Sequence, residues 1–262
     1  MLTVLSPAKK LDYDSPVRTA LQSQPVFPEQ TRELIGILRL LSASDLAGLM
    51  GLSDALARLN ADRYAAWVDA PDARHARQAV LAFDGDVYEG LRAPELSDDR
   101  LNWAQEHLAI LSGLYGVLRP LDLIQPHRLE MGTRLRTARG STLYAWWGDL
   151  IAGELNRRLD ALSGQRILLN LASGEYFKSV DRKALDARVV ECVFQDEKNG
   201  TWKIISFYAK RARGLMARYI VDHGIDDVRD LRDFATEGYA YAPRESSGDR
   251  LVFRRSARPD QG

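Results

Sequence analysis

The sequence predicts a mixed α/β (α+β) fold, a single compact domain built around one mixed sheet. Two observations lead to this prediction. Residues 142–162 have the apolar spacing of a long helix, and the run RILLNLAS that follows has the composition of a buried strand. Asn199-Gly200 is a strong hairpin signal, and strand-like runs at 188–195 and 201–207 flank it. Because helices and strands do not alternate regularly, their order favours a mixed sheet over a purely parallel one.

The elements before residue 142 are predicted from their apolar patterns. Residues 2–5 form a β-prone run that Ser6-Pro7 closes, and this run is expected to enter the sheet. Residues 31–41 and 97–112 carry apolar side chains at helical spacing, so each is predicted to be an amphipathic helix.

The elements after the Asn199-Gly200 hairpin complete the domain. Residues 208–223 have a helical pattern that Gly224 ends, and the runs 238–242 and 250–254 predict a second hairpin. The domain is therefore expected to span residues 1–255. A flexible polar tail is expected at 256–262.

Composition narrows the class of protein. Hydrophobic residues make up 45% of the chain and charged residues 27%, and no apolar run approaches the roughly 18 residues of a membrane span. The N-terminus lacks the pattern of a secretory signal, so a soluble protein in the cytoplasm is expected, with no membrane partner. Lys plus Arg equals Asp plus Glu at 36 each, so any attraction for nucleic acid must come from local patches.

Cysteine and histidine usage predicts no structural metal, and no cofactor is expected because no Walker loop or dinucleotide fingerprint is present. The single cysteine, Cys192, excludes an internal disulfide and alternates with Val190 and Phe194, as a core residue would. The four histidines have no spacing typical of metal ligands. No obligate protein partner is evident.

Residues 44–64 resemble a helix-hairpin-helix motif. An apolar helical segment leads into the turn Gly51-Leu52-Ser53, and Ala57 is expected to pack closely in the helix that follows. Backbone N–H groups at the start of that second helix would suit a DNA phosphate. The usual turn has glycine where this chain has Ser53, so Ser53 has a second interpretation as the N-cap of an ordinary two-helix hairpin, and Asp54 would repel a phosphate.

Basic residues form two segments, either of which could face phosphate. The stronger segment lies at 201–221, where Lys210, Arg211 and Arg213 have aromatic neighbours and no nearby acid in the sequence. A weaker one lies at 119–139. The alternative is that about half of these cations pair with carboxylates elsewhere on a neutral surface.

Two predicted strand ends carry candidate catalytic residues. SPAKKLD follows the first strand and places Lys9 and Lys10 in a loop, although both lysines could simply be solvated. NLASGEYFKS follows the buried strand and gathers groups suited to proton transfer or anion binding, for which the alternative is a structural Glu175–Lys178 pair. The catalytic candidates are Lys9, Asn170, Ser173, Glu175 and Lys178.

Five long strings together resemble the successive motifs of the YaaA peroxide stress response family. They are SPAKKLD, LAFDGDVYEGL, LSGLYGVLRPLDLIQPHRLEMG, NLASGEYFKSV and FQDEKNGTWKIISFYAKRARGLM. The resemblance implies a cytoplasmic bacterial protein, induced by hydrogen peroxide, that limits free iron and protects DNA and protein. It also implies a mixed α/β architecture with a helix-hairpin-helix, a positively charged cleft and DNA binding, but no established catalytic activity.

Two functions follow as hypotheses. The first is a stress protein that binds double-stranded or structured DNA, and the alternative is an enzyme acting on a nucleotide, nucleobase or other phosphorylated small molecule in the basic cleft. Steep loss of affinity with salt would favour the first. The predicted DNA or phosphate contacts are Gly51, Leu52, Ser53, Lys9, Lys10, Lys210, Arg211 and Arg213.

Overall fold

The computed structural model describes residues 1–72 and 74–256. Within these ranges a sheet of eight strands has the order β11-β12-β9-β8-β1-β5-β6, with β10 paired to β9. Five adjacent strands run parallel to one another: β1 (Leu2–Leu5), β5 (Leu108–Ser112), β8 (Ile167–Leu171), β9 (Arg188–Lys198) and β12 (Arg250–Arg255). Antiparallel strands β6 (Gly116–Leu118), β10 (Thr201–Lys203) and β11 (Ala240–Tyr241) complete it. The mixed sheet and the single compact domain predicted from the sequence are confirmed.

The N-terminal strand lies in the middle of the sheet. β1 pairs with β8 through Leu2↔Leu168 and with β5 through Thr3↔Leu108, and every residue of the three strands is buried. Burial on both faces explains why these runs are almost wholly apolar. Two small ribbons lie outside the sheet, β2 (Lys10–Leu11) with β4 (Phe83–Asp84) and β3 (Arg77–Gln78) with β7 (Leu123–Ile124).

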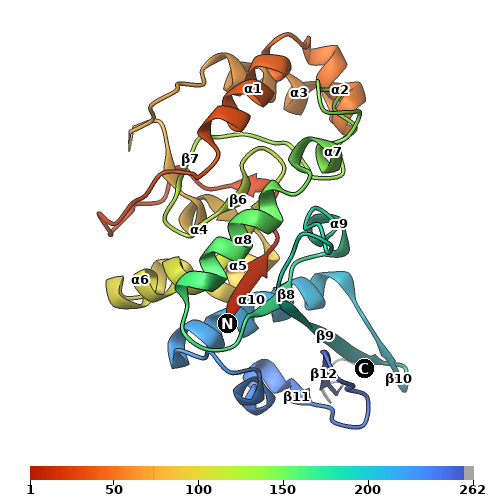
Figure 1. The fold of residues 1–262 in the computed structure, drawn as a ribbon. Coiled ribbons are helices and arrows are strands. Elements are labelled where there is room, and N and C mark those ends of the chain that lie inside the picture. Colours follow the sequence, from red (N-terminus) through yellow and green to blue (C-terminus); the bar gives the residue numbers. More distant parts are fainter. Residues whose placement is uncertain (73, 257–262) are drawn as a thin grey trace.

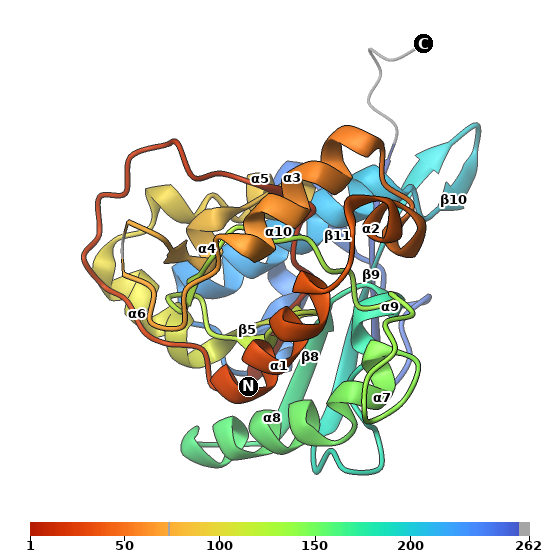
Figure 2. The same ribbon diagram turned by 90° about the horizontal axis from the view of Figure 1, so that it is seen from above.

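Helices cover both faces of the sheet. Figure 2 shows α8 (Leu150–Ala161) on one face and α10 (Ser206–His223) on the other. Helix α5 (Asp86–Leu91) crosses α10, and α6 (Asp98–His107) leads into β5. Shorter helical pieces connect the layers: α4 (Ala79–Ala82), α7 (Leu143–Trp147), α9 (Gly174–Phe177), η1 (Ala93–Glu95), η2 (Val228–Asp233) and η3 (Thr236–Gly238).

A group of three helices lies beyond the end of the sheet at which α9 sits (Figure 1). These are α1 (Pro28–Arg39), α2 (Ala43–Met50) and α3 (Asp54–Ala65). Leu34, Leu38 and Leu46 are fully buried in the same hydrophobic cluster as β1, so the group shares the core of the sheet. Within the described ranges no helix is long and apolar enough to cross a membrane.

Both predicted hairpins are confirmed. β9 and β10 flank Asn199-Gly200, whose φ angles of 53° and 69° are those of a tight hairpin turn. β11 and β12 form the second hairpin. Gly224 ends α10 in the left-handed conformation, as predicted, but the helix begins at Ser206, so Phe207 belongs to the helix and not to the preceding strand. Of the predicted tail, residues 257–262 lie outside the described residues.

Two helix predictions were wrong in part. The pattern over 97–112 ends as a helix at His107, and the continuous apolar run LAILS is the buried strand β5. Such a run carries no period that distinguishes a helix from a strand. The predicted helix over 142–162 is broken at Gly148, whose φ of 51° and ψ of −121° end α7 before α8 begins. The first helix begins at Pro28 and ends at Arg39, slightly earlier than expected.

Candidate functional site

The chain connects the two central strands β1 and β8 to strands on opposite sides of the sheet. They are adjacent and parallel, yet the next strand of the sheet after β1 is β5 on one side, whereas the next after β8 is β9 on the other. In open α/β sheets this change of direction opens a crevice at the carboxyl ends of the strands, where ligands commonly bind. Ser6 follows β1 and Ser173 follows β8, so both predicted loops meet at this point.

Hydrogen bonds join three segments of the chain there. The Ser173 N–H donates to Ser6 Oγ at 2.9 Å, and the two hydroxyl oxygens are 3.3 Å apart. The Tyr88 hydroxyl on α5 donates to the Ser6 carbonyl at 3.0 Å. Ser173 Oγ also caps α9 by accepting from the Tyr176 N–H. We call Ser6, Tyr88 and Ser173 the junction site.

Carboxylates from two segments hold the charged groups beside the junction site. Lys9 Nζ lies 3.0 Å from Glu130 Oε2, and Arg128 donates to Glu130 Oε1 at 2.9 Å. Glu175 Oε1 accepts from the Gly132 N–H at 2.9 Å. Lys9 and Glu175 are thus gathered around residues 128–132.

The predicted alternative for Glu175 and Lys178 was an ion pair, and the described structure has a different arrangement. Lys178 Nζ lies 4.9 Å from the centre of the Tyr144 ring, and the Tyr144 hydroxyl donates to the Glu175 carbonyl at 2.9 Å. Asn170 is buried and its Oδ1 accepts from the Ala172 N–H at 2.9 Å, so it shapes the end of β8.

Tyr176 lies close to these carboxylates and keeps its proton. Burial raises the pKa of its hydroxyl, and the charges of Glu175 and Glu130 raise it further. A neutral phenol donates a hydrogen bond but does not act as a general base at neutral pH. Tyr176 is therefore a hydrogen-bonding group at this edge of the sheet and not a base, and its hydroxyl already has a hydrogen bond with the Met131 backbone.

The basic helix has carboxylate partners that its own sequence does not contain. Arg211 Nη2 lies 2.5 Å from Glu237 Oε1, and Lys210 Nζ lies 4.0 Å from Asp86 Oδ2. Lys10 pairs with Asp84 at 2.5 Å. Arg213 is half-buried, and burial lowers the pKa of its guanidinium. The alternative in which these cations are paired therefore holds for Lys210 and Arg211, whereas Lys10, for which the alternative was a solvated side chain, is paired with Asp84.

The weaker basic segment, residues 119–139, contains arginines that have no carboxylate partner among the described residues. Arg134 and Arg136 are exposed and, among the described residues, form no ion pair; the same holds for Lys178. Arg139 lies over the Trp146 ring at 4.7 Å. Thr133 and Leu135 are buried on either side of Arg134, so the side chains of Arg134 and Arg136 point outward in alternation with them. We call residues 132–139 the arginine loop.

Comparison with known families decides the assignment. A family model described as peroxide stress protein YaaA matches residues 1–245. This chain belongs to that family. It is 63% identical to the UPF0246 protein of Bordetella petrii over 259 residues, which cover 98% of this chain and 100% of the relative. UPF0246 proteins of Bordetella avium and Verminephrobacter eiseniae are each 60% identical, over 97% and 98% of this chain and 99% of each relative.

The YaaA family assignment supports a role in peroxide stress. In the described part of this YaaA-family chain no group of three His, Cys, Asp or Glu side chains is placed to hold a metal ion. Cys192 is buried, as predicted for a core residue, and burial raises the pKa of its thiol.

The α2–α3 hairpin of this YaaA-family protein has the local geometry of a capped two-helix turn. Gly51 ends α2 with φ of 62°, and Ser53 Oγ accepts from the Leu56 N–H at 3.4 Å as the N-cap of α3. Ala57 is buried as predicted, whereas Gly51, Ser53 and Asp54 are exposed. Figure 1 places this hairpin in the upper part of the molecule and α10 in the lower part, so the two predicted phosphate contacts do not converge. A helix-hairpin-helix role for the turn stays a prediction.

Sequence reasoning missed Tyr88, Glu130 and Tyr144. Each lies within or near a string that resembles the YaaA family, but nothing local marks it, because its partner lies more than 30 residues away in the sequence. The excess of arginine over acid at 119–139 was the only signal for the arginine loop.

Proposed function

We propose that this protein serves the response to hydrogen peroxide in the cytoplasm by binding double-stranded or structured DNA. Arg134, Arg136 and Lys178 would contact phosphates, with the exposed turn at Gly51-Leu52-Ser53 as a second contact. The observation that carries the proposal is that these three exposed cations form no ion pair with a described carboxylate. An arginine fork matches the geometry of phosphate oxygens.

Paired cations contribute less to such binding. To reach a phosphate, Arg211 would have to leave Glu237, which accepts from both its Nε and Nη2. A cation that is already neutralised also releases few counterions when DNA binds, and counterion release supplies much of the affinity. The proposal therefore moves the main contact from α10 to the arginine loop and α9.

The physiological part of the proposal comes from family membership. In the cell, we expect the protein to limit free iron and to reduce oxidative damage to DNA and protein during peroxide exposure. A deletion strain complemented with the wild-type gene or with a variant impaired in DNA binding would test whether the two properties depend on each other.

Fluorescence anisotropy of a labelled duplex, and of one with a gap, tests DNA binding directly. Wild type should bind with an affinity that falls with salt, and the Arg134→Ala, Arg136→Ala, Lys178→Ala triple variant should reduce the slope of log K against log salt by about 2 to 3. The matched control is Lys210→Ala with Arg211→Ala, which should change the slope less. Gly51→Val, which strains a left-handed position, should weaken binding if the turn contributes.

Absence of binding at low salt by folded wild type would contradict the proposal. Equal loss in the triple variant and in the control would show that the contact is not at the arginine loop. Circular dichroism of every variant, Gly51→Val above all, confirms that the fold is retained.

A second candidate function is an enzyme acting on a nucleotide, nucleobase or other phosphorylated small molecule. The convergence of Ser6, Tyr88 and Ser173 at the carboxyl ends of β1 and β8 favours it, with Lys178 available for an anionic group and Lys9 available once it leaves Glu130. A thermal-shift screen of nucleoside phosphates is the test. Stabilisation that resists salt and is lost in Lys9→Ala would support this candidate, whereas no shift from any compound would remove it.

A further inference from the structure

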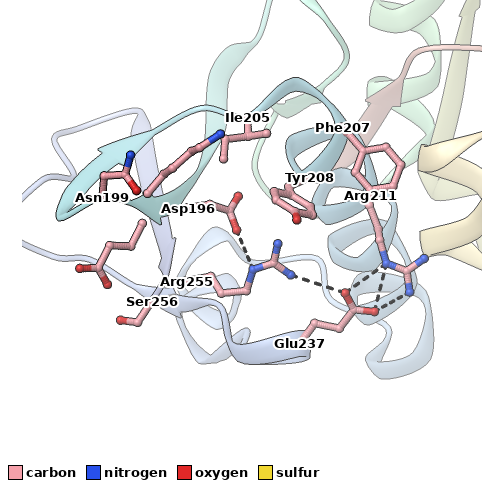
Figure 3. A pocket seen from close by; sticks show the side chains of 11 residues that line it. Asp196, Asn199, Ile205, Phe207, Tyr208, Arg211, Glu237, Arg255 and Ser256 are labelled. Atoms are coloured by element: carbon pink, nitrogen blue, oxygen red, sulfur yellow. Dashed lines mark hydrogen bonds and ion pairs between the residues drawn. The ribbon is translucent and has the colours of Figure 1, made fainter. Parts of the chain in front are cut away.

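A hollow opens along the same edge of the sheet as the junction site, at the carboxyl ends of β9 and β12. Its volume is about 770 Å³, and it lies between the β9–β10 hairpin, the start of α10 and η3 (Figure 3). Its size falls within the range of small-molecule sites. We call it the β9–β12 pocket. Eleven residues line it: Asp196, Glu197, Lys198, Asn199, Ile205, Phe207, Tyr208, Arg211, Glu237, Arg255 and Ser256.

Arg255 is held rigidly in the wall of this pocket. Its guanidinium lies 4.8 Å from the centre of the Tyr208 ring and 4.6 Å from that of Tyr239, and its Nε donates to Asp196 Oδ1 at 2.6 Å. Asp196 is itself buried and accepts from the Tyr239 hydroxyl at 3.0 Å. The side chain of Arg255 is only 14% exposed, so it is fixed before any ligand arrives.

The terminal nitrogens of Arg255 keep donor capacity. Among the described residues, Nε is the one Arg255 nitrogen with a hydrogen-bond acceptor; Nη1 is 3.8 Å from Glu237 Oε2, an ion-pair distance. Figure 3 shows the guanidinium between Asp196 and Glu237, with Tyr208 close by. The Nη1 and Nη2 groups of an arginine form a fork of N–H donors, and such a fork in a pocket wall recognises a ligand edge with two neighbouring acceptors.

Acceptors lie beside these donors. Glu237 adopts φ of 53°, a conformation rare outside glycine, and Arg211 holds its carboxylate through two nitrogens. The lining contains three carboxylates, Asp196, Glu197 and Glu237, and three cations, Lys198, Arg211 and Arg255. Because these charges cancel, the pocket does not favour a phosphate, and it suits a neutral ligand that both donates and accepts hydrogen bonds.

An exposed aromatic side chain completes the pocket. Phe207 is 54% exposed although it is large and apolar, and it packs against Tyr208 with ring centres 5.6 Å apart. Exposed aromatic rings next to hydrogen-bonding groups are typical of sites on which planar rings stack.

From these features we infer that the β9–β12 pocket binds a nucleobase. A nucleobase is planar, uncharged and lined with both donors and acceptors. Guanine fits best, because its O6 and N7 match an arginine fork while its N1–H and exocyclic N2 amino group match a carboxylate. The inference goes beyond the proposed function and does not depend on it, since the pocket would take a free nucleoside even if the protein bound no DNA.

Isothermal titration of the full-length protein with guanosine, adenosine, cytidine and inorganic phosphate tests the inference. Guanosine should bind most tightly and phosphate should not compete. Phe207→Ala should weaken guanosine binding roughly tenfold, because it removes one stacking surface. Ile204→Ala is the matched control: Ile204 is 59% exposed and next to the pocket but does not line it, so binding should be unchanged.

Arg255→Gln tests the hydrogen-bonding part and should abolish the preference for guanosine over adenosine. Because Arg255 is packed between two rings, its variant is interpreted only with a normal circular dichroism spectrum, and Phe207→Ala keeps the inference testable if the variant does not fold. No binding of any nucleoside, equal binding by Phe207→Ala and wild type, or competition by phosphate would each overturn the inference.

A further experiment with DNA distinguishes two sources of the base, an unpaired base in DNA and a free nucleoside. A duplex with one unpaired guanine should bind more tightly than the fully paired duplex, and lose this advantage in Phe207→Ala, if the source is DNA; equal binding of both duplexes, with guanosine still bound, identifies a free nucleoside. Either result supports a nucleobase pocket. The paired duplex reports on the arginine loop alone, so failure of the DNA proposal remains distinguishable from failure of this one.

Discussion

His127 is a titratable residue enclosed by aromatic rings, and its chemistry links the pH to the stability of the fold. Its ring centre lies 5.2 Å from that of Tyr115 and 6.3 Å from that of Phe83, and Nδ1 lies 2.8 Å from the Gln125 carbonyl oxygen. Burial lowers the pKa of His127 to about 4. The folded protein therefore keeps a neutral imidazole whose Nδ1–H donates to Gln125.

We predict that acid destabilises the protein through this residue. The unfolded imidazole has a pKa near 6.5, so between about pH 6.5 and pH 4 the unfolded state binds a proton that the folded state does not. The contribution of the neutral His127 imidazole to stability is fully present above pH 6.5. As the pH drops from 6.5 to 4, the free energy of unfolding should fall by up to about 1.4 kcal/mol per pH unit. Urea unfolding at pH 7.5, 6.5, 5.5 and 4.5 measures it.

The control is His127→Gln, which retains a donor but does not titrate. Carboxylates titrate equally in both proteins, so the difference between the two pH profiles isolates His127. Parallel profiles would show that the imidazole is not held neutral by the fold.

At the scale of elements, α5 and α10 meet backbone to backbone. A Cβ added at Gly214 would clash with the Val87 carbonyl oxygen, and one added at Gly90 would clash with that of Arg211. The crossing fixes Tyr88, and with it the hydroxyl that donates to Ser6, so the junction site depends on two glycines that do not touch it.

We predict that Gly214→Ala destabilises the protein by at least about 2 kcal/mol, because neither backbone can move away without separating the helices. Chemical denaturation gives the free energy of unfolding. Gly153→Ala on α8 is the matched control, since a Cβ there meets nothing within 4 Å and alanine gains about 1 kcal/mol in helix propensity. Similar effects of the two substitutions would mean that the crossing is not tight.

Element prediction succeeded where the signal was local. The Asn199-Gly200 turn and the C-terminal Gly224 of α10 act through their own backbone conformation, and both were predicted. The end of α6 was not, because Arg158 on α8 donates to the carbonyls of Gln105 and Leu108 and stabilises the change from helix to strand. Because Arg158 lies 50 residues after Leu108, the apolar spacing of α6 does not indicate where that helix ends.

At the scale of the whole molecule, strand order decides what the candidate site contains. Ser6 and Ser173 are 167 residues apart and touch only because β1 inserts between β5 and β8. Both loops were predicted from the sequence as candidate sites, but the contact between them was not predicted. It also showed the cations of α10 without the acids opposite them, since Glu237 and Asp86 come from other segments. Patches of charge are therefore predicted poorly from one segment.

The same topology predicts cooperative unfolding. Residues from Met1 to Phe253 contribute to one hydrophobic cluster, and the α1–α3 group is tied to it by buried leucines and by the Tyr64 hydroxyl, which donates to the Arg128 carbonyl. Removing any layer would expose β1, so no part is expected to unfold alone. Far-UV circular dichroism and the fluorescence of variants that keep only Trp67, beside α3, or only Trp147, in the core, should report one urea midpoint. A lower midpoint for Trp67 would show that the α1–α3 group opens separately, and the Gly51-Leu52-Ser53 turn would then have to bind DNA as a mobile element.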